Sequence, residues 1–267
     1  MKEDVREHVV GYLQKNKDIF AWAPQDLEGI DPGVITHHLN LDPAIRPIKQ
    51  KKRHFGPEKD KIIQREVNKL LRTGHIREIQ FQEWLSNVVL VPKLGAKWRM
   101  CIDFRDLNKA SPKDYYPLPG IDQLVDSMSG CELLKMMDAS QGYHQITLAL
   151  KDHKRVSFIT SDGTLCYVAM PFGLKNAGST YQKLVDKIVR PQLGRNMEVY
   201  VDDMLVKSKK FYDHVKDLNE TFAVLRRYRL KLNPGKCAFG LSGGRFLGFM
   251  VTQNEVLKLT QVKSRLY

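Results

Sequence analysis

Two adjacent aspartates interrupt an apolar stretch late in the chain, in the run Tyr200-Val201-Asp202-Asp203-Met204. The residues on both sides favour two buried strands, so we expect the acidic pair at the tip of a tight hairpin. A two-residue turn usually contains Asn-Gly or Asp-Gly, and this run has no glycine. Two neighbouring carboxylates also repel one another unless a cation lies between them. The run is therefore either ordinary turn chemistry, the commoner role of Asp-Asp, or a cation site.

A third aspartate, Asp138, closes another apolar run that begins at Leu133. An aspartate that closes a strand is usually a cap or a turn residue. Together, however, Asp138, Asp202 and Asp203 supply hard oxygen donors, which suit Mg²⁺ because this ion binds few carboxylates and leaves positions for substrate phosphates. We therefore predict a site for two Mg²⁺ ions, for which Mn²⁺ can substitute, with phosphoryl transfer as its chemistry.

The chain has a formal net charge of +13, from 43 Lys and Arg against 30 Asp and Glu. This charge attracts polyanions, among which nucleic acid is the commonest, although a basic surface that is merely solvated has the same composition. With 42% apolar and 27% charged residues, the chain is globular in composition, which excludes disordered, collagenous and solenoid classes. The four cysteines lie at least 30 residues apart and predict neither a zinc site nor a disulfide framework.

No targeting or membrane segment is expected. The first ten residues are charged where a secretory signal needs an apolar core, and no apolar run approaches the roughly 18 residues of a membrane span. We therefore expect a cytoplasmic or nuclear protein without a membrane partner.

Strands and helices are mixed without a regular βαβ alternation, which predicts an α+β fold with a largely antiparallel sheet. Residues 1–56 begin with a short helical pattern (Val9, Val10, Leu13), are then punctuated by prolines, and are expected to form an extended N-terminal arm. Helices are expected between residues 57 and 74 and over 119–129, 176–189 and 214–228, and strands over 87–91, 98–104, 133–138, 145–150, 156–159, 165–171, 197–201, 204–206, 230–239 and 246–251.

Four ordered blocks carry a resemblance to a known family: Trp98–Asn108, Met137–Ile146, Met170–Ala177 and Tyr200–Met204. In this order and spacing they resemble the reverse transcriptase domain of a gypsy-type LTR retrotransposon polyprotein. The amino-acid sequence of the blocks is most similar to the plant elements of that group. The resemblance extends over nearly the whole chain. It implies an RNA-directed DNA polymerase, which transfers dNTPs onto a primer 3′-hydroxyl with two Mg²⁺ ions, on an RNA or DNA template with an annealed primer.

The resemblance also implies a fold, the fingers and palm of a right-hand polymerase. Residues 57–130 match the fingers and 131–267 the palm with its primer-grip strands, with some finger strands interleaved around 150–170. The palm sheet should be antiparallel and backed by helices. The thumb is expected to be absent, because the chain stops just past the primer-grip strands, and such a fragment is expected to synthesise DNA with low processivity at best.

Individual roles are implied by position in the matching blocks. Asp138, Asp202 and Asp203 match the catalytic metal ligands, and Lys236 matches a lysine that protonates the leaving pyrophosphate. The remaining matches contact substrate or primer: Lys93 and Arg99 at the triphosphate, the backbone of Ala139, Ser140, Gln141 and Gly142 beside it, Tyr143 as a gate against the ribose 2′-hydroxyl, Phe172 near the incoming sugar, and Leu247 and Gly248 at the primer.

Several alternatives stay open at this stage. Taken singly, Tyr143 is more often a core residue than a gate, and Lys93, Arg99 and Lys236 are ordinary solvated charges. An RNA-dependent RNA polymerase would share the acidic residues, and a nucleic-acid-binding relic without activity would keep them too. The sequence also leaves open the natural primer and template, the oligomeric state, and whether the chain is a fragment of a longer polyprotein.

Overall fold

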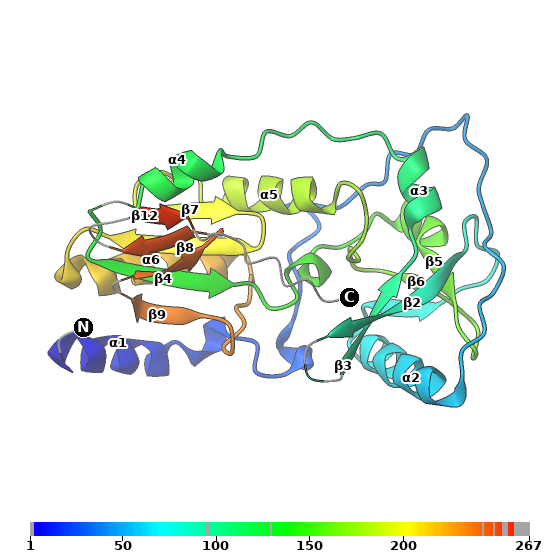
Figure 1. Ribbon diagram of the computed structural model, residues 1–267, viewed down its shortest axis with the longest axis horizontal. Coiled ribbons are helices and arrows are strands. Elements are labelled where there is room, and N and C mark those ends of the chain that lie inside the picture. Colours follow the sequence, from blue (N-terminus) through cyan, green and yellow to red (C-terminus); the bar gives the residue numbers. More distant parts are fainter. Residues whose placement is uncertain are drawn as a thin grey trace. The chain divides into compact units, whose positions relative to one another are not determined.

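The computed structural model describes residues 3–258, apart from residues 94, 96, 129, 242, 248 and 253–255. The chain divides into two compact units, which are described separately (Figure 1). The first unit comprises Met1–Asp26, Tyr116–Ser140 and Gln182–Tyr267, and the second comprises Leu27–Tyr115 and Gln141–Tyr181. The expected boundaries after residues 56 and 130 do not coincide with these, because long-range packing divides both the arm and the central segment.

The first unit contains two antiparallel sheets. The larger sheet has the strand order β7-β8-β4-β9, and the smaller one has the order β10-β11-β12. The strands of the larger sheet are β4 (Leu133–Asp138), β7 (Met197–Tyr200), β8 (Asp203–Ser208) and β9 (Ala238–Leu241), and those of the smaller are β10 (Gly243–Phe246), β11 (Phe249–Thr252) and β12 (Val256–Lys258). The predicted antiparallel sheet is thereby confirmed.

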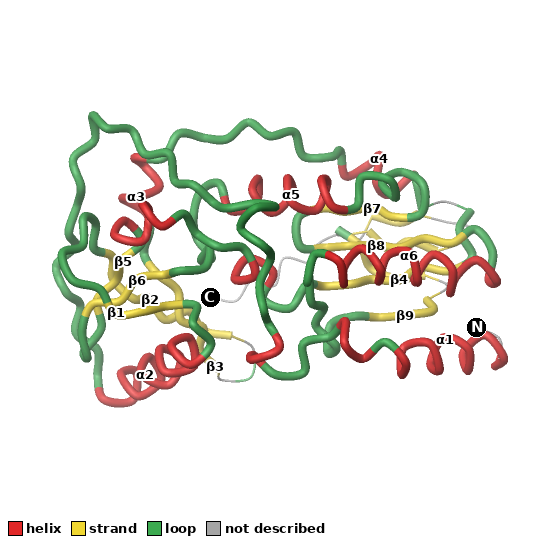
Figure 2. The backbone as a smooth tube through the Cα atoms, turned by 180° about the vertical axis from the view of Figure 1, so that it is seen from behind, coloured by secondary structure: helices red, strands yellow, loops and turns green. Residues whose placement is uncertain are grey.

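The two faces of the larger sheet are covered differently. Helix α6 (His214–Arg227) lies across one face, as the views from both sides show (Figures 1 and 2). Its buried positions Leu218, Phe222 and Leu225 recur at helical spacing, which is the pattern that predicts a helix packed on a sheet. The other face packs on α4 (Ile121–Asp126) and on Phe246 of β10, which form a buried cluster with Leu134 and Leu205.

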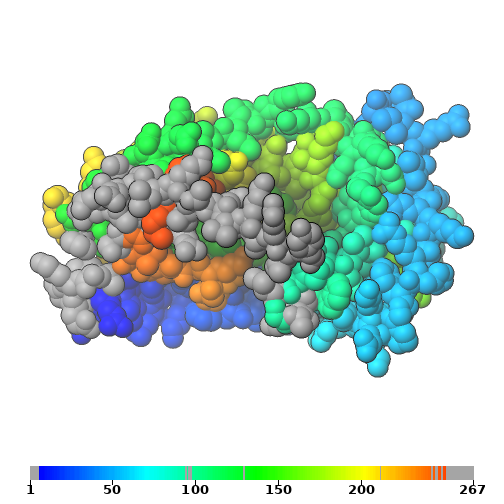
Figure 3. Space-filling view, in the orientation of Figure 1, coloured from blue at the N-terminus to red at the C-terminus, as the bar shows by residue number. Residues whose placement is uncertain are grey.

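The N-terminal residues of the first unit pack on α6 and β9. Residues Glu3–Lys15 form helix α1, in which Tyr12 stacks on Phe222 with ring centroids 5.7 Å apart. Phe20 contacts the edges of Phe222 and Phe239. The surface of α1 lies beside that of β9 (Figure 3). The short helix expected around Val9, Val10 and Leu13 is therefore present as α1, and two short 3-10 helices, Lys17–Ile19 and Pro24–Asp26, follow it.

The second unit is built on a five-stranded sheet with the order β1-β6-β5-β2-β3, in which only the β2–β5 pair is parallel. Its strands are β1 (Ile76–Glu78), β2 (Ser86–Lys93), β3 (Lys97–Ile102), β5 (Ser157–Ile159) and β6 (Thr164–Tyr167). Helix α2 (Pro57–Arg72) buries Ile63, Val67 and Leu70 on one face, and the short helix α3 (Arg105–Ala110) follows β3. Helix α5 (Ala177–Ile188) begins in this unit and ends in the first.

Two expected strands are wrong in whole or in part. Of residues 230–239, only Ala238 and Phe239 lie in a strand, β9, because the turn over residues 234–236 interrupts the run and Leu232 forms only isolated bridges. Residues 145–150 form no ladder and are flanked by 3-10 helices over Gly142–Gln145 and Leu150–Arg155. Their backbone groups are satisfied by isolated partners instead, such as the N–H of Ile30 on the carbonyl of Gln145 and the bridge between Thr147 and Ala169. The alternating apolar residues of this segment therefore reflect its burial and not its pairing with a neighbouring strand.

Within the part of the chain that the structure describes, no helix is both long and apolar enough to cross a membrane.

Candidate active site

The β7–β8 hairpin carries two of the predicted acidic residues. Tyr200 pairs with Asp203, so the two turn residues are Val201 and Asp202. The expectation that both aspartates occupy the tip is thus corrected, because Asp203 is the first residue of β8.

The turn is strained at its first residue. Val201 has a φ of 51°, a left-handed conformation that is costly for a β-branched side chain. No glycine relieves this strain, which agrees with the unusual composition of the turn. Such strained residues persist where the surrounding structure holds them, and they cluster at functional sites.

The β4–β8 ladder places Asp138 directly opposite Asp203. Side chains of directly paired residues project from the same face of a sheet, so these two carboxylates share a face. Along each strand the alternation puts Asp138 on the side of Leu134 and Asp203 on the side of Leu205. Both leucines belong to the cluster with α4 and β10, so the carboxylates project from the face opposite α6.

Burial and neighbouring carboxylates raise the pKa values of Asp202 and Asp203. Burial, followed by the charges of Asp138 and Asp203, raises the pKa of Asp202 to about 6. Burial and the Asp138 carboxylate also raise the pKa of Asp203. In both cases the ammonium of Lys236 opposes the shift without cancelling it. The turn therefore holds more negative charge than its protein surroundings neutralise.

Lys236 is the described cation nearest to this charge. Its Nζ lies 3.1 and 3.0 Å from the two carboxylate oxygens of Asp138, although 63% of the lysine side chain is exposed. The neighbouring Cys237, which the sequence analysis did not single out, contacts the backbone of Asp138, whose N–H donates to its Sγ at 3.5 Å. Burial raises the pKa of this thiol to about 11, so Cys237 stays protonated and adds no negative charge.

The acidic residues fit a divalent cation by their chemistry. One carboxylate oxygen of Asp202, Oδ1, is buried without a hydrogen-bond partner among the described residues. A buried acceptor of this kind needs a partner, and carboxylate oxygens are the ligands that Mg²⁺ prefers. As the side chains stand, no three His, Cys, Asp or Glu residues of the described part form a group ready to hold a metal. The ammonium of Lys236 bound to Asp138 is the feature that a cation would have to displace.

A pocket of about 270 Å³ opens beside the paired aspartates. It is lined by Asp138, Asp203 and Lys236, together with Leu247, which was predicted from resemblance to contact the primer. Gly248, the other predicted primer residue, lies outside the described residues. The structure thus brings four of the predicted site residues to one pocket of the first unit.

The predicted backbone segment after Asp138 belongs to both units. Ala139 forms a bridge with Leu232, and the N–H of Ser140 donates to the carbonyl of Lys231 at 2.9 Å, both in the first unit. Gln141 follows in the second unit with a left-handed φ of 48°. This conformation reverses the chain and starts the 3-10 helix in which Gly142 lies.

Tyr143, predicted as the sugar gate, belongs to an aromatic cluster of the second unit. Its ring stacks on that of Phe172, with centroids 4.8 Å apart, and lies 5.6 Å from that of Tyr181. Phe172 is 49% exposed, so one side of this stack faces solvent. A Cβ atom on Gly142 would lie only 2.9 Å from the Tyr181 ring. Only glycine therefore fits at position 142 while Tyr181 stays in place, and the sequence analysis had not connected these two residues.

Lys93 and Arg99 lie on the β2–β3 hairpin of the second unit. The register pairs Val91 with Arg99, and Lys93 lies two residues from Val91, so Lys93 and Arg99 project from the same face. Both are exposed. Trp98 projects from the other face, where the Nζ of Lys59 on α2 lies 5.3 Å from its ring centroid. The two predicted phosphate-binding cations are therefore presented together, away from α2.

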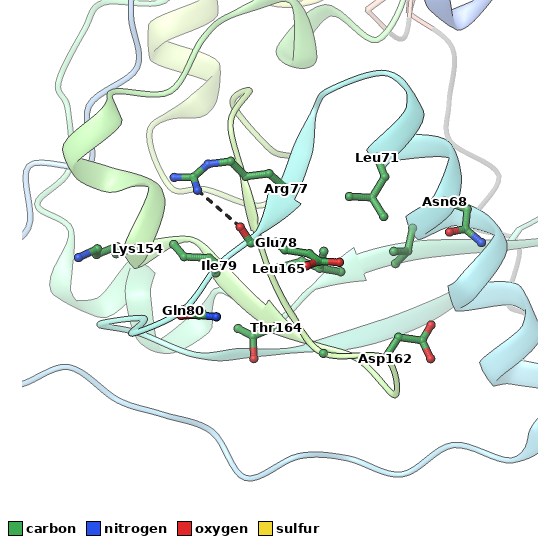
Figure 4. Close-up of a pocket in the computed structure, with 12 residues that line it drawn as sticks. Asn68, Leu71, Arg77, Glu78, Ile79, Gln80, Lys154, Asp162, Thr164 and Leu165 are labelled. Carbon is green, nitrogen blue, oxygen red and sulfur yellow. Dashed lines mark hydrogen bonds between the residues drawn. The ribbon is translucent and has the colours of Figure 1, made fainter.

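A larger open pocket of about 670 Å³ lies elsewhere in the second unit, beside β1, β6 and α2 (Figure 4). Its polar lining includes Arg77, which donates to the backbone carbonyl of Glu78. None of the predicted site residues lines this pocket.

Residues 91–251, more than half of the chain, match the family described as reverse transcriptase (RNA-dependent DNA polymerase). The chain belongs to this reverse transcriptase family. It is 32% identical over 228 residues to the retrovirus-related Pol polyprotein from transposon 297 of Drosophila melanogaster, covering 84% of this chain and 21% of that protein. It is also 32% identical over 199 residues to the Pol polyprotein from transposon gypsy of the same organism, covering 72% of this chain and 19% of that protein. The predicted family, a reverse transcriptase domain of LTR retrotransposons, is confirmed.

The fold is confirmed by solved structures. The foamy viral protease-reverse transcriptase in complex with an RNA/DNA hybrid matches this chain with a TM-score of 0.85 at 20% identity, covering 98% of this chain and 34% of that chain. The same viral protein in complex with dsDNA matches with a TM-score of 0.84 at 21% identity, covering 96% and 52%. This chain thus spans about a fifth of the curated relatives named above and between a third and a half of these structures.

The positive φ of Val201 predicts that glycine is more stable than alanine at this position, the reverse of the order expected in a strand. Glycine tolerates a left-handed conformation and alanine does not, so Val201→Gly should be more stable than Val201→Ala by about 0.5–1 kcal/mol. Urea unfolding measures this difference. At the strand residue Val199, the control, glycine should be less stable than alanine by a similar amount. The conformation assigned to Val201 is refuted if both positions give the control order.

The raised pKa of Asp202 predicts a stability that depends on pH. Between the ordinary pKa of 3.8 and about pH 6, Asp202 is protonated in the folded chain and ionised in the unfolded chain. The penalty for ionising Asp202 is therefore absent below this window, grows within it and is complete above it. In metal-free buffer, Asp202→Asn should raise the free energy of unfolding at pH 7.5 by roughly 1–2 kcal/mol, allowing for solvent screening, and change it little at pH 4.

Urea unfolding at the two pH values tests this, with the exposed Asp122→Asn of α4 as a charge-matched control. Equal effects of Asp202→Asn at both pH values would contradict the electrostatic origin of the penalty.

Proposed function

We propose that this chain is an RNA-directed DNA polymerase that joins a dNTP to a primer 3′-hydroxyl with release of pyrophosphate. The observation that carries the proposal is the pairing of Asp138 with Asp203 at the ends of adjacent strands, with Asp202 on the intervening turn, in a chain of the reverse transcriptase family. The reaction needs a concentrated negative charge that binds cations beside phosphates, and this turn provides it.

Asp138, Asp202 and Asp203 are the proposed ligands of two Mg²⁺ ions. When bound, such ions lower the pKa of the attacking hydroxyl and neutralise charge on the phosphates. Lys236 is the proposed general acid, because its exposed ammonium already lies at the acidic cluster and can donate a proton to the leaving pyrophosphate. Leu247, in the same pocket, is proposed to contact the primer terminus.

Further residues are proposed to contact the incoming nucleotide. Lys93 and Arg99 share a face of their hairpin and offer two cations to the triphosphate, Arg99 with a planar fork for phosphate oxygens. Tyr143 and Phe172 are proposed to contact the sugar, where the ring of Tyr143 excludes a 2′-hydroxyl. The backbone from Ala139 to Gly142 is proposed to lie beside the triphosphate, which small side chains permit.

Nucleic acid is the proposed partner. The net charge of +13 favours binding to phosphate backbones, and the foamy viral relative was solved with an RNA/DNA hybrid and with dsDNA. We propose an RNA or DNA template with an annealed primer as the substrate of this chain.

Primer extension tests the catalytic proposal. On an RNA template with an annealed DNA primer, dNTPs and Mg²⁺, Asp202→Asn should lower the extension rate by a factor of about 10³ or more, because it removes a charged ligand. Asp122→Asn should extend at the parent rate, since this exposed residue lies on α4 and lines none of the described pockets. Equal extension by Asp202→Asn and its parent would refute the proposed roles, and binding of the template without extension by the parent would favour the inactive relic.

Sugar selectivity tests the role of Tyr143. Replacing Tyr143 with Ala removes the ring proposed to collide with the 2′-hydroxyl, so the preference for dNTPs over NTPs should fall by about tenfold or more, on the order of 1.4 kcal/mol. The ratio of kcat/KM values for matched dGTP and GTP measures it. An RNA polymerase would instead prefer GTP before any substitution, and an unchanged ratio would remove Tyr143 from sugar selection.

A further inference from the structure

The strained turn that carries Asp202 is held by a residue of α5. The backbone N–H of Val201 donates to Oε1 of Gln182 at 2.6 Å. Gln182 is 1% exposed, so its amide is shielded from water that could replace this bond. A lost hydrogen bond at a buried N–H costs about 1–3 kcal/mol, and here the loss would fall on a residue that is already strained. The Gln182 carbonyl therefore supports the left-handed conformation of Val201.

The orientation of the Gln182 amide is set mainly by a carboxylate, beside a longer contact of 3.5 Å from Nε2 to the carbonyl of Val199. The same Nε2 donates to Oδ1 of Asp186, one helical turn further along α5, at 2.8 Å. An amide can present either its oxygen or its nitrogen, but an ionised carboxylate only accepts hydrogen bonds. Asp186 therefore draws the NH₂ group to itself and directs Oε1 to Val201. The opposite orientation would place oxygen against oxygen and nitrogen against an N–H.

Asp186 is in turn held by Tyr116. The tyrosine hydroxyl donates to the second carboxylate oxygen, Oδ2, at 2.7 Å. The ammonium of Lys183 lies 5.2 Å from the centroid of the Tyr116 ring. One continuous chain of hydrogen bonds therefore runs from Tyr116 through Asp186 and Gln182 to Val201, the residue next to Asp202. All of these residues belong to the first unit.

We propose that Gln182 and Asp186 are positioning residues for the polymerase reaction, with Asp186 acting through the amide orientation of Gln182. The proposal rests on the proposed function, since it assigns Asp202 to the reaction. It adds that α5 sets the geometry of the turn formed by Val201 and Asp202. Asp186 touches no reacting group and affects the turn only while Gln182 is present.

A double-mutant cycle tests this dependence. Gln182→Met removes the amide while keeping its length, and Asp186→Asn removes the charge that orients it. Each single variant should lower kcat for primer extension by about tenfold to a hundredfold, with KM for dNTP and primer–template little changed. Asp186→Asn should have no further effect in the Gln182→Met background, because residues that act through one another are not additive.

Hydrogen exchange of the Val201 amide provides a readout that does not depend on activity. Its protection should fall by the same factor in both single variants and in the double variant. Gln192→Met is the matched control: Gln192 is also 1% exposed in the first unit and donates to Thr221, so its loss should lower stability without changing exchange at Val201.

The outcomes separate the two proposals. Additive losses of kcat, or unchanged exchange at Val201 in either single variant, would overturn the positioning role. If the parent chain extends no primer, the proposed function fails, while the exchange measurements still decide whether Asp186 orients Gln182.

Discussion

The register between β4 and β8 is the constraint on which the candidate site depends. Six consecutive pairs, from Leu133 with Ser208 to Asp138 with Asp203, align the two strands without a bulge. Like charges directly opposite one another destabilise a sheet, so the final pair is unfavourable by itself. The ladder holds it because the preceding pairs bury apolar side chains on both faces. A slip of β8 by one residue would turn Asp203 to the α6 face and move the strand's α6-facing apolar side chains to the face packed on α4.

Polar contacts on the opposite face make this register specific. Lys135 is fully buried, and its ammonium donates to the backbone carbonyl of His214 on α6 at 2.7 Å. Burial lowers the pKa of Lys135 to about 6, so the lysine is held at a cost that only a matched partner offsets. Ser208, at the other end of the ladder, donates to Asp217 of the same helix at 2.7 Å. These bonds form in one alignment of β4, β8 and α6, and they therefore reinforce the pairing that assembles the acidic residues.

Several unfavourable features are concentrated at the β7–β8 turn. Val201 has a left-handed backbone, the pKa values of Asp202 and Asp203 are raised, and one oxygen of Asp202 is buried without a partner among the described residues. Elsewhere in the first unit, the buried ammonium of Lys207 is paired with the carboxylate of Glu198 at 2.7 Å. Strain and uncompensated charge at one turn are typical of a site that gains its missing partner from a ligand.

The amino-acid sequence alone predicts the elements whose signal is local. The apolar period of α6, the run that forms β4 and the hairpin around Asp202 are where the patterns predicted them, because side-chain alternation and helical spacing act over a few residues. The resemblance in four ordered blocks identified the family, because these blocks contain the residues proposed to carry out the reaction. Long-range packing is what leaves residues 145–150 without a ladder, divides the first 56 residues between two units and places Asp203 in a strand. It alone also connected Gln182 and Asp186 to Val201, since each of these outcomes depends on partners distant in sequence, and no local pattern records which distant group will satisfy a buried polar atom.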